Sequence, residues 1–130
     1  MRHQKLTPRT EYRQQESLRT QASATLSEKF RQLKSLTAEL SYFSPDGVSQ
    51  NRHIKYTAHP AHAKSVFRFD CLNDECVGGD FDLSEALAQA VAAGKTTATG
   101  EVCCQGWLSA TTINGIRCHR ILRYKLTLGY

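Results

Sequence analysis

The chain has 130 residues, an apolar fraction of 40% and a charged fraction of 22%, which are ordinary values for one folded globular domain. It contains no run of about 18 apolar residues and no apolar segment after its basic start, so we expect neither a membrane helix nor a secretory signal. We therefore expect a cytoplasmic protein with no membrane partner. Thiols stay reduced in that compartment, so the five cysteines need an explanation other than disulfides.

The net charge of +5 falls entirely within residues 1–35, where eight basic residues outnumber three acidic ones, whereas nine of each sign cancel in the remainder. Such asymmetry is typical of a basic segment that binds a polyanion, here nucleic acid or a ribonucleoprotein. The expected phosphate contacts are Arg9, Arg13, Arg19, Arg31 and Lys34. The alternative is a solvated helix that merely favours lysine and arginine.

The same segment, residues 1–35, is predicted to be helical and to form a region of its own. Thr7 precedes Pro8, a capping residue before a proline in the first turn. Apolar residues then recur at helical spacing, at Leu18, Ala22, Leu26, Phe30 and Leu33. Thr25 and Glu28 form a possible capping box, which predicts a break near Ser23. Residues before Leu18 have little to bury, so we expect them to be disordered or to order on a partner, including a second copy.

From residue 36 the apolar period changes from helical to alternating. Leu36, Ala38, Leu40 and Tyr42 share one face of a predicted strand. A second strand is predicted at 53–58 and a third at 65–71, with Phe67 and Phe69 on one face of the third.

A second helix is predicted where Leu83, Leu87 and Val91 share a face, and Gly94 is a natural stop. A fourth strand follows at 97–104 and a fifth along the alternating tail that begins at 118. Residues 36–130 are therefore predicted to be an α+β domain, with a mostly antiparallel sheet of about five strands and one packed helix. We expect the helix to pack on a sheet face that includes Phe67, Phe69 and Leu122.

Four cysteines are placed to bind a metal at one end of that sheet. Cys71 and Cys76 flank a four-residue loop followed by two glycines, Cys104 ends the fourth strand, and Cys118 begins the fifth. Four thiolates around a tetrahedral Zn²⁺ close a structural site. The pattern resembles zinc-ribbon and zinc-knuckle modules, which implies zinc as the cofactor. Residues 36–130 are therefore predicted to be a zinc-stabilised α+β domain.

Two features of the sequence leave the ligand set open. Asn114-Gly115 is a strong hairpin turn, and an uninterrupted hairpin around it would place Lys125, not Cys118, opposite Cys104. We prefer the register in which Cys104 and Cys118 face each other. Neighbours on a strand point to opposite faces, so Cys103 and His119 are expected to point away from the site, although either is an alternative ligand. The remaining alternatives are buried free thiols and a redox pair at Cys103 and Cys104.

Catalytic motifs are absent from the sequence: it has no glycine-rich phosphate loop, no GxSxG and no HExxH. The acidic group around the first cysteines is expected to be solvated and to cap a helix, and consists of Asp70, Asp74, Glu75, Asp80 and Asp82. The favoured function is a non-enzymatic zinc protein that binds nucleic acid through its basic helix. The alternatives are a protein–protein adaptor or homo-oligomer that uses the apolar stripe, then a thiol redox or metal sensor, and last an enzyme.

Overall fold

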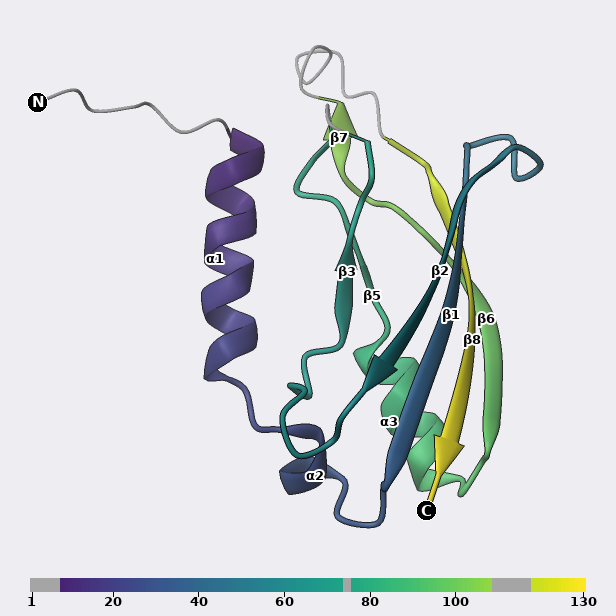
Figure 1. Ribbon diagram of the computed structural model, residues 1–130. Helices are drawn as coiled ribbons and strands as arrows, with labels where there is room; N and C mark the ends of the chain where they lie inside the picture. The colour runs from purple at the N-terminus through teal and green to yellow at the C-terminus, as the bar shows by residue number, and fades with distance from the viewer. Residues whose placement is uncertain (1–7, 74–75, 109–117) are drawn as a thin grey trace, which may run out of the picture.

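The computed structural model describes residues 8–73, 76–108 and 118–130, and within them the chain is mixed α and β. The elements in chain order are α1 (Pro8–Ala22), α2 (Leu26–Lys29), β1 (Ser35–Phe43), β2 (Gln50–Ala58), β3 (Arg68–Asp70), β4 (Cys76–Val77), β5 (Asp80–Asp82), α3 (Ser84–Ala92), β6 (Thr97–Cys103), β7 (Trp107–Leu108) and β8 (Ile121–Gly129). Four of the strands form an antiparallel sheet in the order β2-β1-β8-β6 (Figure 1). The prediction of an α+β fold built on an antiparallel sheet is confirmed.

The alternating pattern positions the core on one face of this sheet. Along β1, Leu36, Ala38 and Leu40 are buried while the residues between them are more exposed. The register pairs β1 with β8 so that Leu36 lies opposite Leu128 and Ala38 opposite Leu126. Opposed residues of antiparallel strands point to the same face. The buried leucines of both strands therefore form one apolar surface, as the alternation predicted.

Helix α3 covers this apolar surface. Leu87, Ala90 and Val91 are buried in one core cluster with the leucines of β1 and β8. Gly94, with φ of 64°, takes the left-handed conformation that ends the helix without a steric penalty. Helix and stop were both expected from the sequence.

The predicted third strand, in contrast, does not join the four-stranded sheet. Only β3 is extended in that region, and it pairs with β5 as a separate two-stranded ribbon, while β4 pairs with β7 in another. After β2 the chain turns toward α2, where the Ser27 amide donates to the Pro60 carbonyl at 2.8 Å. This contact draws the chain away from the edge of β2. Phe67 is still buried in the core and Phe69 packs against it, with the two rings edge-on at 5.0 Å. Neither lies on the four-stranded sheet, so the expectation that they share a sheet face with Leu122 is wrong.

The apolar stripe from Leu18 to Leu33 does not form one helix face. Helix α1 ends at Ala22, and Thr25 and Glu28 make the predicted capping box at the start of α2. Leu18 is 67% exposed on α1, whereas Leu26 and Leu33 are buried in the core beyond the break. The stripe is therefore divided between α1, α2 and the turn that follows α2. None of the helices within the three described ranges is long and apolar enough to cross a membrane.

Candidate metal centre

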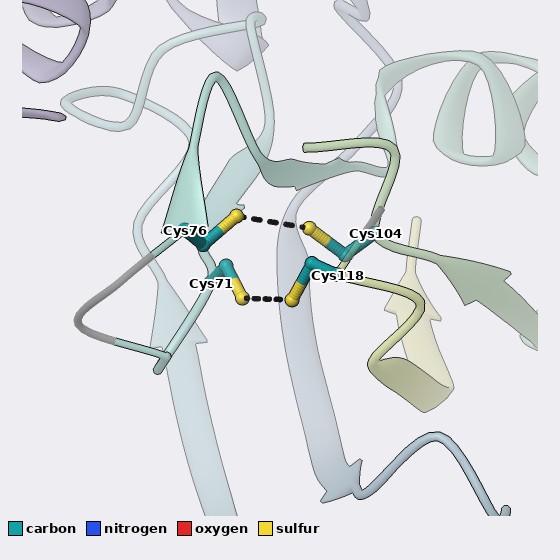
Figure 2. Close-up of side chains that lie close together, drawn as sticks. All are labelled: Cys71, Cys76, Cys104 and Cys118. Carbon is teal, nitrogen blue, oxygen red and sulfur yellow. Dashed lines mark hydrogen bonds between the residues drawn. The ribbon is translucent and has the colours of Figure 1, made fainter. Parts of the chain in front are cut away.

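Cys71, Cys76, Cys104 and Cys118 converge at one end of the fold, where their sulfurs lie within 4.8 Å of one another (Figure 2). Cys71 follows β3, Cys76 begins β4, Cys104 follows β6 and Cys118 precedes β8. The Sγ atoms of Cys71 and Cys118 are 3.6 Å apart, and those of Cys76 and Cys104 are 3.5 Å apart. None of the four residues is more than 4% exposed. The structure thus gathers the four cysteines that the sequence analysis selected into one buried group.

The register of β6 and β8 brings the last two cysteines together. Cys103 lies opposite Ile121, and Lys125 lies opposite Thr99, not opposite Cys104. The pairing continues beyond the strands, since the Cys104 amide donates to the Arg120 carbonyl at 2.7 Å and the Cys118 amide to that of Gly106 at 2.9 Å. Cys118 therefore faces Gly106 and is diagonal to Cys104, which corrects the expectation that the two cysteines face each other. Asn114-Gly115, the rival turn, lies outside the described residues.

Two glycines let the backbone approach the sulfurs closely. A Cβ built on Gly79 would overlap the sulfurs of both Cys76 and Cys104, and one on Gly106 would overlap the Cys76 sulfur and come within 2.7 Å of the Gly79 backbone. Gly78, with φ of 70°, supplies the turn between Cys76 and Gly79. The Gly106 amide also donates to the Cys104 sulfur at 3.5 Å. Only glycine fits at 79 and 106 while the sulfurs keep these positions.

The separations between sulfurs fit a metal ion better than disulfides. Four thiolates about 2.3 Å from a tetrahedral Zn²⁺ are roughly 3.8 Å apart along each edge. The separations of 3.5 Å between Cys76 and Cys104 and 3.6 Å between Cys71 and Cys118 are close to that edge. A disulfide needs about 2.05 Å between sulfurs. All five cysteines are free, and the donor set of four soft sulfurs suits zinc among the divalent ions.

Each buried thiol affects the pKa of its neighbours. The hydrogen bond from Cys104, aided by the Asn73 amide, lowers the pKa of Cys71 to about 5. Burial, followed by the charge on Cys71, raises the pKa of Cys76 to about 12. The pKa of Cys104 is also raised, because its thiol donates a hydrogen bond to Cys71 and is buried. One sulfur of the group thus ionises readily and suppresses ionisation of its neighbours. A divalent cation reverses this, because a coordinated thiol is deprotonated outright.

Helix α1 docks on the cysteine loop through polar contacts. The Arg9 guanidinium donates to the carbonyl oxygens of Cys71 and Cys76, at 2.8 Å each, and to that of Asn73. Tyr12 donates to Asp80 at 3.0 Å, and burial, with this hydrogen bond, raises its pKa to about 12. Figure 1 shows α1 standing beside the β3–β5 ribbon, away from the four-stranded sheet.

Sequence reasoning missed the contacts of Arg9 with the loop carbonyls. The available signal was that a tight loop leaves backbone carbonyls in need of donors.

The five cations predicted to contact nucleic acid fall into two groups. Arg9, Arg13 and Arg19 have partners within the protein: the loop carbonyls for Arg9, Asp70 at 3.8 Å for Arg13, and Glu16 at 2.8 Å for Arg19. Arg31 and Lys34 are exposed and lie beyond α1. Within the described ranges, three of the five cations therefore have partners in the protein and two do not.

The remaining polar residues near the cysteines have structural roles. Arg68, only 8% exposed in its side chain, pairs with Asp80 at 2.7 Å and with Asp70 at 3.4 Å. Asp82 accepts from the Ser84 amide at the start of α3, and Asp74 and Glu75 lie outside the described residues. Cys103 and His119 are exposed and outside the group of four sulfurs. Asp82 thus satisfies an amide at the start of α3, as expected of a capping residue, whereas Asp70 and Asp80 pair with Arg68 instead of being solvated only.

Comparisons with protein-family models, curated proteins and solved structures found no match, so the site is interpreted from its geometry alone.

Proposed function

We propose that this chain is a zinc-binding protein in which Cys71, Cys76, Cys104 and Cys118 hold one structural Zn²⁺. The observation that carries the proposal is the group of four buried sulfurs within 4.8 Å of one another. Around them, Gly79 and Gly106 leave the space the sulfurs occupy, and the Gly106 amide donates to one of them. Hydrogen bonds of this kind orient and tune metal ligands.

The proposed metal is structural because the protein fills all four positions of a tetrahedral site. Catalytic zinc needs an open position for water or substrate. A closed site instead ties together segments that are distant in sequence, here the loop after β3 and the region between β6 and β8. The chain would therefore act by binding and not by catalysis. We retain nucleic acid or a ribonucleoprotein as the proposed partner, on the support of the net charge of +5 and the exposed cations.

The test compares two neighbouring cysteines. Cys104 is buried in the group of four and Cys103 beside it is exposed, so Cys104→Ser and Cys103→Ser form a matched pair. Elemental analysis should find one zinc per chain in the wild type and in Cys103→Ser, and much less in Cys104→Ser. Thiol titration should find four protected cysteines that become reactive when a chelator is added. If folded protein purified with zinc present carried no metal, or if Cys103→Ser lost zinc as completely as Cys104→Ser, the proposal would be wrong.

A further inference from the structure

A basic hollow lies at the opposite end of the sheet from the cysteines. It has a volume of about 370 Å³ and is walled by the segment from α2 to β1 on one side and by the turn after β2 on the other. Arg31, Lys34, His59 and His62 contribute its polar side chains, together with Ser27. The Lys34 amide donates to the carbonyl of Gly129, the last residue of β8, whereas Cys118 lies just before that strand begins. The length of β8 thus separates the hollow from the sulfurs.

Backbone hydrogen bonds hold the two walls together. The Ser27 amide donates to the Pro60 carbonyl and the Leu26 amide to that of Ala63, both at 2.8 Å. Across the turn itself, the Ala63 amide donates to the His59 carbonyl at 2.8 Å. Leu26 and Leu33 anchor the first wall in the core. The hollow therefore exists before any ligand arrives, which lowers the ordering cost of binding.

The charged side chains that line the hollow are all basic. Its lining contains two permanent cations and two imidazoles and no carboxylate. Within the three described ranges, none of these four side chains makes an ion pair or hydrogen bond, whereas Arg9, Arg19, Arg68 and Arg123 all do. Cations that converge without a counterion repel one another, and an anion between them relieves that repulsion.

We infer that this hollow binds a phosphate group, carried by a nucleotide or by the backbone of a nucleic acid. Arg31 offers a planar fork for two phosphate oxygens, and Lys34 offers a point charge beside it. The imidazoles of His59 and His62 offer ring N–H donors from the facing wall. Donors on two walls suit a tetrahedral oxyanion, whose oxygens point in several directions, better than a planar carboxylate. Such contacts position a nucleic acid without reading its sequence.

Of the five cations that the sequence predicted to contact phosphate, Arg31 and Lys34 line this hollow. It stands apart from the zinc proposal, because no cysteine lines the hollow. Zinc content and phosphate binding can therefore fail separately, and both are measured on every variant.

The experiment titrates the zinc-loaded full chain with two probes, a fluorescent single-stranded RNA of mixed sequence and a fluorescent nucleoside triphosphate, between 25 and 200 mM salt. The test variants are Arg31→Gln with Lys34→Gln, and His59→Gln with His62→Gln. The control is Lys95→Gln with Lys125→Gln, which removes the same charge from exposed positions outside the hollow. The arginine–lysine pair should lose roughly 10- to 100-fold in affinity and flatten the salt slope by about 1.4, or 0.7 for each lost phosphate contact. The histidine pair should lose affinity to a smaller degree.

The two probes identify the source of the phosphate. Tight binding of the triphosphate, displaced by inorganic phosphate, assigns the hollow to a nucleotide, whereas binding of the RNA alone assigns it to a nucleic-acid backbone. Either result supports the inference if it is lost in the arginine–lysine pair. The inference is overturned if neither probe binds at 25 mM salt, or if the arginine–lysine pair weakens binding no more than the control pair does. With zinc content unchanged, that outcome leaves the metal proposal intact.

Discussion

Replacing Arg9 tests whether α1 is held by the cysteine loop. Arg9→Met keeps a flexible unbranched side chain and removes the donors to the carbonyls of Cys71, Asn73 and Cys76. A hydrogen bond that involves a charged group contributes about 1.5–3 kcal/mol, and because Arg9 is only partly buried we take less than half of the sum for three, roughly 2–4 kcal/mol. For a chain of this size that lowers Tm by roughly 6–16 °C. The loop should also release zinc faster, since its carbonyls lose the group that restrains them.

The assay is a thermal melt of zinc-loaded protein by circular dichroism, together with the rate of zinc transfer to a chelating dye. Arg31→Met is the control: it removes the same charge from an exposed residue that makes no hydrogen bond or ion pair within the described ranges. We expect the control to melt and release zinc as the wild type does. If Arg9→Met matched the control in both measurements, the contacts between α1 and the loop would contribute nothing to stability, and the reasoning would be refuted.

Two further substitutions test the core and the metal centre. Leu87→Ala should destabilise the fold by about 2–5 kcal/mol in chemical denaturation, because Leu87 is 0% exposed. As the control, Leu18→Ala at a site 67% exposed should change the stability by no more than about 0.5 kcal/mol. Equal effects of the two substitutions would contradict the placement of α3. Gly79→Ala should reduce the zinc content, because the new Cβ overlaps two of the sulfurs. The control is Gly78→Ala, whose Cβ has no atom within 4 Å. It should keep the metal and lower the stability of the fold by only about 1 kcal/mol, because of the positive φ at this position. Full zinc content in Gly79→Ala would show that the sulfurs are not where the structure places them.

The parts of the fold that the sequence predicted are those in which a short-range pattern determines the result. A slip by one residue moves every side chain of a strand to the other face, so the alternation along Leu36–Leu40 and Leu122–Leu128 specifies which residues are buried. The cysteine group was predicted for a related reason. The observed register, with Cys104 beside Arg120 and Cys118 beside Gly106, lies closer to the preferred register than to its rival, so it still brings the two cysteines to the same end.

The parts that the sequence did not predict depend on contacts between distant segments. β3 pairs with β5, which follows Gly78 with its positive φ, and nothing in the alternation of 65–71 distinguishes that ribbon from a strand of the main sheet. Leu26 and Leu33 lie within the predicted basic region, yet they are buried in the core with the sheet. A truncation that removed residues 1–34 would therefore take part of the core with it.

The net positive charge counted along residues 1–35 is larger than the charge that these residues leave free to bind a partner. Four thiolates outweigh the two charges of a zinc ion, so the proposed metal cluster is anionic. Arg9 and Arg13 belong to α1 and contact the loop that carries Cys71. Their positive charge offsets the negative charge of the cluster and of Asp70. Arg19 is paired with Glu16 on the same helix. Much of the excess on α1 is therefore compensated within the protein. The cations that remain for a polyanion are those without a partner, and Arg31 and Lys34 bring two of them to one hollow.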